Sequence, residues 1–267
     1  MAGATTAERG GDRRQSDSGP RPPAGRPRRW FRRPRLLIAL LVPAVLLGGF
    51  GAWAAYGSDW LRIERVSVHW SGGPRNLTEE QILEAAGVSV GEPMASLDKG
   101  AIAGRLLDEL PRLASVEVVR GWPHGVSLKV TERSAVVLMP NGDGYTEVDA
   151  GGVPFAETGE ARRGVPLLEL ELEESASLRR FGEDRIREAA VSVVTSLPGE
   201  LRRDTRVVRA TSYDSVTLEL SGDRVVRWGS AEDSAAKAEA LTAVMNAADG
   251  ARYFDVTVPS APAASGG

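Results

Sequence analysis

The chain offers few side chains for acid–base, nucleophilic or metal chemistry. Its only imidazoles are His69 and His124, and it has no cysteine. Disulfides, thiolate metal sites and cysteine nucleophiles are therefore excluded, and a serine nucleophile would need one of these two histidines as its base. His69 falls on the polar side of an alternating segment, and His124 stands in a turn between Pro123 and Gly125. We predict that both are solvated surface residues, and that the chain has no catalytic and no metal-binding residue.

Two acidic segments are the remaining candidates for chemistry. Glu169, Glu171, Glu173 and Glu174 largely alternate with leucines, a pattern more typical of the solvated face of a strand than of a metal cluster. Residues 141–144 place one carboxylate on a turn, without a second acid beside it. No G-x-S-x-G, P-loop or H-E-x-x-H string occurs. These features predict a protein that is not an enzyme, binds no cofactor and takes no small-molecule substrate.

The elements that position these side chains begin with an uncharged stretch, residues 36–56, LLIALLVPAVLLGGFGAWAAY. A helix of this length, at ~1.5 Å per residue, matches the ~30 Å hydrocarbon core of a bilayer. Pro43 and the nearby glycines are poor choices in a soluble helix but are tolerated in a membrane helix. Trp53 and Tyr56 stand at the far end, where interfacial aromatic residues belong. We predict a single transmembrane helix over residues 36–56.

The distribution of charge predicts the orientation of this helix. Residues 1–35 contain ten arginines against three acidic residues, a net charge of +7, which leaves −10 for the rest of a chain whose total is −3. Because positive residues beside a span stay on the cytoplasmic side, we expect a cytoplasmic N-terminus and an extracytoplasmic C-terminus. The competing interpretation is a cleaved signal peptide, because Ala52-Trp53-Ala54 resembles an A-x-A cleavage site.

The segment before the span, residues 1–35, is rich in Gly, Pro, Ser and Arg and has almost no large apolar residue. It cannot bury enough apolar surface to offset the entropy of ordering, and we predict a disordered cytoplasmic tail. Its main role is to orient the span. Binding of anionic lipid headgroups or of nucleic acid is the less favoured role, and we expect no nucleic-acid partner.

Residues 60–133 carry the pattern of a small mixed domain. The string IERVSVHW alternates apolar and polar residues, as a half-buried strand does. Thr78 and Gln81 form a capping box at the start of a helix that Gly87 ends. The predicted order is β-α-α-β-β, with the second helix and the last two strands at about residues 98–110, 116–120 and 126–131.

Residues 134–259 predict a second, β-rich domain. Turn signals such as residues 141–144, whose Asn and Gly accept positive φ, separate short strands. The last strand covers residues 252–258, and we expect a flexible C-terminal tail over residues 260–267. The other strands are predicted at about residues 135–139, 145–148, 153–156, 167–172, 206–210, 216–220 and 224–228.

Two helices interrupt these strands. The first spans about residues 178–197 and ends at Pro198-Gly199, because proline and glycine together stop a helix. Ser230 and Asp233 resemble a helix cap before the second helix.

These segments resemble the FtsQ/DivIB family of bacterial cell-division proteins. RIERVSV, LTEEQILEAAGVSVGEPM and LLDELPRLASVEVVRGWPHGVSLKVTERSAVVLM are similar to the family's POTRA domain, whereas GYTEVDAGGVPF, SAEDSAAKAEALTAVM and ARYFDVTVP are similar to its β-domain. The resemblance implies an α+β fold class, with a single transmembrane helix, a POTRA domain over residues 60–133 and a β-domain with two helices over residues 134–259. Residues in the family's places include Arg120, Trp122, Pro123, Glu132, Arg133 and Lys237.

The resemblance also implies a function. A member of this family would be a bitopic membrane scaffold of the divisome at the division septum. Its β-domain would recruit FtsB/DivIC-like and FtsL-like membrane proteins and help control septal peptidoglycan synthesis, with the septal peptidoglycan synthase as a further candidate partner. The alternative is a membrane-tethered, POTRA-containing envelope-assembly or sensor protein.

The end of the β-domain is the expected partner-binding site. Unpaired backbone N–H and C=O groups at a sheet edge can pair with a strand of another protein. Carried over by position from the family, the partner-binding residues are Tyr253, Phe254, Asp255, Val256, Thr257, Val258 and Ser260. The sequence departs from the family's pattern after Pro259, where only small residues and one more proline follow, without an aromatic side chain to anchor a partner.

Overall fold

The computed structural model describes residues 34–57, 59–172 and 176–266, so the predicted disordered tail lies almost wholly outside the described residues. Helix α1 (Pro34–Tyr56) covers the predicted span. Its window Leu37–Ala54 has a mean hydropathy of 2.1, and none of it is buried against protein. By length and composition α1 is the one helix among the described residues that could cross a membrane. The chain from Ala52 onward forms a separate compact unit.

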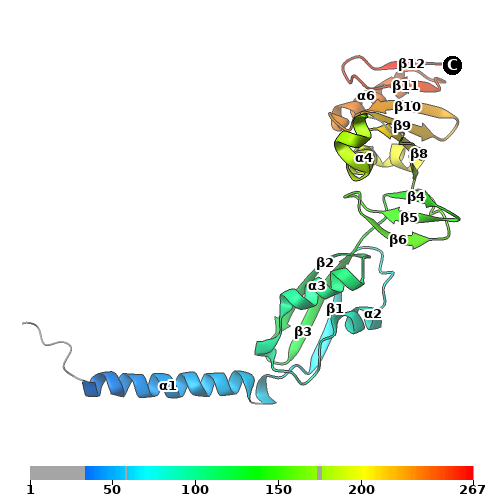
Figure 1. Cartoon of the computed structure of the whole chain (residues 1–267). Coiled ribbons are helices and arrows are strands. Elements are labelled where there is room, and N and C mark those ends of the chain that lie inside the picture. The colour runs from blue at the N-terminus through cyan, green and yellow to red at the C-terminus, as the bar shows by residue number, and fades with distance from the viewer. Residues whose placement is uncertain (1–33, 58, 173–175, 267) are drawn as a thin grey trace, which may run out of the picture. The chain divides into compact units, whose positions relative to one another are not determined.

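The first module of that unit is a three-stranded sheet with two helices (Figure 1). Its strands lie in the order β1-β3-β2, with β1 parallel and β2 antiparallel to β3. The predicted β-α-α-β-β order is confirmed. The elements are η1 (Asp59–Leu61), β1 (Arg65–Gly72), α2 (Glu79–Ala86), η2 (Met94–Ser96), α3 (Lys99–Glu109), β2 (Leu113–Gly121) and β3 (Gly125–Glu132).

Local signals in the sequence define the ends of α2. The Thr78 side chain accepts a hydrogen bond from the Gln81 N–H, and the Gln81 side chain accepts one from the Thr78 N–H, which completes the predicted capping box. Gly87 follows in the left-handed conformation, with φ 55°, which closes a helix without a Cβ penalty. The helix buries Ile82 in one core with Leu106 of α3, and both are 0% exposed.

A buried carboxylate ties the loop after β1 to the end of β3. Glu132 is 3% exposed and accepts hydrogen bonds from Trp70 Nε1 (3.3 Å) and from the N–H groups of Asn76 (2.7 Å) and Leu77 (3.1 Å). Three donors satisfy a carboxylate that water cannot reach. Gly73, at φ +91°, lets the loop approach closely, since a Cβ there would lie 2.4 Å from the Glu132 carbonyl oxygen.

The second module is built on nine strands in the order β12-β11-β10-β9-β8-β7-β4-β5-β6, which Figure 1 shows stacked from β6 to the C-terminal strand. The pairs β4–β7, β7–β8 and β10–β11 are parallel, and the others are antiparallel. The strands are β4 (Val137–Asn141), β5 (Gly144–Val148), β6 (Pro154–Thr158), β7 (Leu167–Leu170), β8 (Thr205–Ser212), β9 (Ser215–Leu220), β10 (Arg224–Gly229), β11 (Tyr253–Asp255) and β12 (Ala263–Ser265).

Helices α4 (Ala176–Ser196) and α6 (Ser234–Ala247) contact each other and share a core with this sheet. Ile186 of α4, Leu241 of α6 and Trp228 of β10 are all 0% exposed. The helix predicted over residues 178–197 is present, although Gly182, at φ 74° and ψ 162°, interrupts its regular conformation.

A short helix, α5 (Gly199–Asp204), follows where the sequence predicts only the end of α4. Pro198 is its N-cap residue. Pro198 is an ambiguous sequence signal, because a proline ends a helix that precedes it but is tolerated at the start of a helix that follows.

The predicted cap of α6 is wrong. Asp233 is the N-cap residue, but it has φ 53° and makes no side-chain cap hydrogen bond. Ser230 instead accepts a hydrogen bond at its carbonyl oxygen from Lys237 Nζ, at 2.9 Å. Lys237 is 3% exposed, and burial lowers its pKa despite the opposing charges of Asp233 and Glu232. A buried lysine, rather than a serine cap, thus ties the preceding loop to α6.

The predicted last strand and tail also differ from the structure. β11 ends at Asp255 rather than at residue 258, because Asp255 Oδ1 accepts hydrogen bonds from the N–H and Oγ1 of Thr257. Such a local side-chain bond competes with continuation of the ladder. Residues 263–265, within the segment expected to be a flexible tail, form β12 antiparallel to β11. These three small residues have no alternating pattern, so their pairing rather than their sequence makes them a strand.

Ion pairs connect the first module to the β5–β6 end of the large sheet. The Glu147 side chain of β5 is fully buried, and its oxygens lie 2.7 Å from Arg112 Nη1 and 2.9 Å from Arg162 Nη2. Arg133, which follows β3, pairs with Asp149, which follows β5. A buried carboxylate that loses its cations is strongly destabilising, so these contacts hold this end of the sheet to the first module.

Candidate partner-binding edge

The structure places His69 on the surface, as predicted, whereas the His124 side chain is only 25% exposed and its Nδ1 is buried without a hydrogen-bond partner. His69 is exposed on β1, and its Nδ1 lies 3.0 Å from Ser127 Oγ on β3. The residue paired with His69 across the ladder is Lys129, a cation where a catalytic triad needs a carboxylate. His124, in the β2–β3 turn, has its Nδ1 3.6 Å from Glu64 Oε1, beyond hydrogen-bond length.

Two glutamates of the acidic run after β6 share one arginine with Glu219 of β9. Arg209 Nη2 lies 2.8 Å from Glu169, its Nε lies 2.9 Å from Glu171, and its Nη1 lies 2.5 Å from Glu219. Glu173 and Glu174 lie outside the described residues. Over residues 34–57, 59–172 and 176–266, no group of three or more His, Cys, Asp or Glu residues could hold a metal ion.

The residues predicted to bind a partner begin in an interior strand. β11 pairs in parallel with β10 on one side and antiparallel with β12 on the other, so the backbone of Tyr253, Phe254 and Asp255 forms no free edge. The N–H of Val256 is also used within the sheet, where it donates to the Arg227 carbonyl oxygen at 3.0 Å. A partner strand cannot pair directly with β11 while β12 is in place.

The side chains of these seven residues divide into two groups. Phe254 and Val256 are 2% and 0% exposed and pack in the core of the second module. The others reach the surface to different extents. They are Tyr253 (40% exposed) and Val258 (54% exposed), half-buried Asp255 and Thr257, and exposed Ser260.

The edge next to this segment belongs to β12. Ala263, Ala264 and Ser265 pair with Asp255, Phe254 and Tyr253 on one side, and β12 is the terminal strand of the sheet among the described residues. It contains neither a charge nor a proline, the residues that protect exposed edges from pairing. What this edge can do chemically is to donate and accept main-chain hydrogen bonds.

A polar cluster stabilises the turn between β11 and β12. Burial alone would raise the pKa of Asp255, but the hydrogen bonds from Thr257 and the charge of Arg227, whose Nη1 lies 3.7 Å away, together lower it. Gly229, at φ +81°, lets the end of β10 approach Thr257 closely, because a Cβ on residue 229 would lie 3.1 Å from Thr257 Cγ2. The ionised carboxylate and the close approach hold the chain in position as it returns to form β12.

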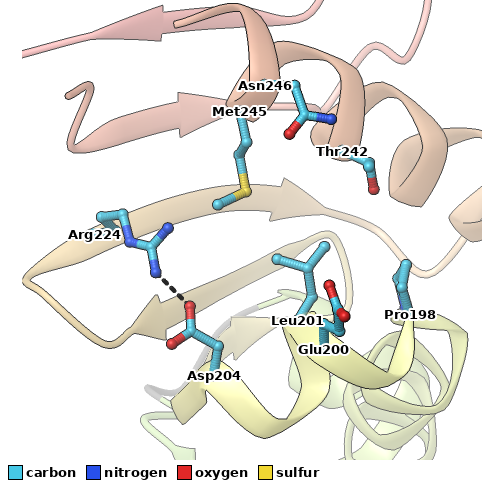
Figure 2. Close-up of a pocket in the computed structure, with 8 residues that line it drawn as sticks. All are labelled: Pro198, Glu200, Leu201, Asp204, Arg224, Thr242, Met245 and Asn246. Atoms are coloured by element: carbon cyan, nitrogen blue, oxygen red, sulfur yellow. Dashed lines mark hydrogen bonds and ion pairs between the residues drawn. The ribbon is translucent and has the colours of Figure 1, made fainter. Parts of the chain in front are cut away.

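The helix-covered side of the module has a hollow of about 420 Å³ between α5 and α6. Figure 2 shows Asp204 and Arg224 paired at this hollow, with Thr242, Met245 and Asn246 contributed by α6. The Asp204 carboxylate also accepts a hydrogen bond from the Ser221 hydroxyl. Within this hollow the Asp204 carboxylate is thus engaged by Arg224 and Ser221.

Sequence reasoning missed β12, which forms this edge of the sheet. Its residues are small and lack the β-branched and aromatic side chains that mark strands. The one available signal is the pair of prolines at 259 and 262, which favours a turn that returns the chain beside the preceding strand.

Comparison with known proteins reveals similarity along the whole chain. Residues 61–133 match the family model described as POTRA domain, FtsQ-type. The chain is 53% identical over 272 residues to the cell division protein FtsQ of Streptomyces collinus and 51% identical over 273 residues to that of Streptomyces coelicolor, with 100% of each chain covered in both cases. It is 29% identical over 228 residues to the cell division protein FtsQ of Mycobacterium tuberculosis, covering 85% of this chain and 68% of the relative.

Proposed function

The chain belongs to the FtsQ family of cell division proteins, and on that premise we propose that it is a non-enzymatic scaffold that captures partner strands at its C-terminal sheet edge. The family is one of division-septum membrane proteins, and α1 fits a single pass. The proposed orientation places the N-terminus in the cytoplasm and residues 57–267 outside, because the arginines precede the span.

The observation that carries this proposal is the unprotected outer edge of β12. A strand from an FtsB/DivIC-like or FtsL-like membrane protein would extend the sheet there, since backbone pairing supplies affinity without demanding particular side chains. We extend the proposal to the side chains that the sequence names as partner-binding, which lie in β11 and in the segment between β11 and β12. Tyr253, Asp255, Thr257, Val258 and Ser260 would contact the partner, and Phe254 and Val256 would support the edge from the core.

Control of septal peptidoglycan synthesis follows from contact rather than from chemistry. A scaffold that gathers membrane proteins raises their local concentration and sets their geometry. We propose that this protein acts on the septal peptidoglycan synthase through the partners that it assembles.

Disulfide crosslinking in cells tests the edge directly, because the chain has no native cysteine. One variant carries Ser265→Cys on β12, and its control carries Thr158→Cys on the opposite edge strand, β6. Each is expressed with an FtsB/DivIC-like partner that carries single cysteines along its predicted strand. We expect crosslinks from position 265 and none from position 158. Equal crosslinking at both edges would reject the assignment.

A fluorescent fusion separates this function from the alternative, a membrane-tethered POTRA protein of envelope assembly or sensing. A band at midcell that depends on the partner supports the divisome scaffold. An even halo along the cell periphery supports the alternative.

A further inference from the structure

The first module carries two large apolar side chains in solvent at one end of its sheet. Trp122 is 58% exposed in the turn between β2 and β3, and Val90 is 67% exposed in the loop after α2. The core of this module is complete without them, since Ile82, Leu106 and Leu128 are 0% exposed. Two such side chains at the same end of the module, rather than scattered singly, mark a candidate contact surface.

Backbone hydrogen bonds bring the segments that carry these two residues to the point where the chain enters this module. The His124 carbonyl oxygen, in the same turn as Trp122, accepts from the N–H of Glu64 (2.8 Å) and of Arg65 (3.2 Å). On the loop that carries Val90, the Gly91 N–H donates to the Ile63 carbonyl oxygen (2.8 Å). The turn and the loop thus flank residues 62–65, which lead into β1.

Chain length limits how far this entry point can be from a membrane. Only residues 57–61 separate the end of α1 from Arg62. A chain that extends at most ~3.5 Å per residue keeps Arg62 within about 20 Å of the end of α1. The headgroup layer beyond the hydrocarbon core is itself several ångströms thick, about 5–7 Å on each side. The Trp122 turn is therefore within reach of the lipid surface through covalent connectivity alone.

The charges around this end do not favour attraction by anionic lipid. Arg65 is exposed, but so are Glu64 and Glu92, and Arg62 is paired with Asp59 at 2.7 Å. A lipid contact here would depend on apolar insertion, for which tryptophan is well suited because its ring is apolar and its N–H remains hydrated at the interface.

We infer that Trp122 and Val90 insert into the headgroup layer of the leaflet that faces the soluble region, and so anchor the first module to the membrane surface. This contact goes beyond partner capture at β12 and requires only that α1 spans the bilayer. This contact would restrict the motion of the first module relative to the membrane surface.

Single-cysteine labelling of the full chain tests the anchor. Val90→Cys, which keeps Trp122 in place, carries an environment-sensitive fluorophore (NBD), and the protein is placed in phosphatidylcholine nanodiscs with or without nitroxide lipid. Ser71→Cys, at the other end of β1, and Asp143→Cys, in the β4–β5 turn, are the matched controls, and both are exposed. A probe inserted about 5–10 Å into the headgroup boundary should lose about half of its emission to the nitroxide, and both controls should keep theirs.

A second variant assigns the anchor to the tryptophan itself. Trp122→Asp in the Val90→Cys background should release the fluorophore at position 90 from the nitroxide, with thermal unfolding unchanged because Trp122 is outside the core. Adding phosphatidylglycerol should leave the quenching within twofold. Unquenched emission at position 90, quenching equal to that of the controls, or quenching at position 90 that survives Trp122→Asp would each overturn the inference.

Discussion

The two edge strands of the nine-stranded sheet differ in whether they carry residues that discourage pairing with another chain. At one end, Glu147 of β5 is buried between Arg112 and Arg162, and the edge strand β6 begins with Pro154 and carries Glu157. At the other end, β12 has no charge and no proline. A proline and a charge discourage pairing with a further strand. The difference supports the proposal that the second end, rather than the first, binds another chain.

The largest expected effect is on the free energy of unfolding, from a substitution at the β5–β6 end of the sheet. Glu147→Ala removes the buried acceptor that Arg112 and Arg162 share and leaves a cavity, so the free energy of unfolding should fall by about 3 kcal/mol. Urea denaturation of the purified chain measures this loss. Glu157→Ala is the matched control, because Glu157 is an exposed glutamate on the adjacent strand and its removal should change the free energy by less than about 0.5 kcal/mol. Equal losses in the two variants would contradict the structural role of Glu147.

The next effect is on binding at the open end. Ala264→Pro removes a main-chain donor from β12 and distorts the edge, so the affinity for an FtsB/DivIC-like partner should fall by about 2 kcal/mol, or about 30-fold. Isothermal titration with the partner's extracytoplasmic region measures the dissociation constant.

Ala156→Pro provides the control for this substitution, because Ala156 is the central residue of the other edge strand. It should disturb β6 and leave the affinity for the partner within twofold. If Ala156→Pro weakened binding as much as Ala264→Pro, the partner would not distinguish the two edges.

Removing the protection from β6 should make the two ends more alike. The double substitution Pro154→Val and Glu157→Thr replaces the proline and the charge with residues that favour strands. We expect weak self-association through this edge, with a dissociation constant on the order of 0.1 mM, about 5 kcal/mol. Light scattering coupled to size exclusion at increasing protein concentration measures it. A strictly monomeric variant would indicate that the joint to the first module, rather than edge composition, blocks pairing.

The smallest effect concerns the turn that supports β12. The pKa of Asp255 is lowered below its ordinary value of 3.8 in the folded protein, so its stabilising contribution is present above that value and is lost as the pH falls through the lower, folded-state pKa. Asp255→Asn should cost about 0.5 kcal/mol at neutral pH. The difference from the wild type should disappear in acid, as measured by urea unfolding at both pH values. A difference that persisted in acid would assign the effect to packing rather than to charge.

Much of the first module could be predicted from its sequence because its signals are local. Thr78, Gln81 and Gly87 define α2 by hydrogen bonds and backbone conformation within a few residues. The β-α-α-β-β order follows from alternation, helix periodicity and turn residues. The same reasoning failed at Asp233, where the capping pattern is present but Lys237 makes the bond to the loop.

The open edge could not be predicted because the strand pairing that creates β12 is not local. The alternation of residues 252–258 favours a long terminal strand, and the family resemblance placed partner contacts there. Asp255 ends that strand through its hydrogen bonds to Thr257, and the small residues that follow become the edge only by pairing with β11. A strand of Ala-Ala-Ser lacks the β-branched and aromatic side chains from which a strand is predicted.

The sequence by itself determined the apolar span, the charge difference across it, the domain order and the family, because each depends on composition or on residue spacing along the chain. Tertiary structure alone decided which strand is outermost and which residues are buried beside it. Strand order depends on hydrogen bonds between segments far apart in sequence, and one additional three-residue strand converts an apparent edge into an interior position.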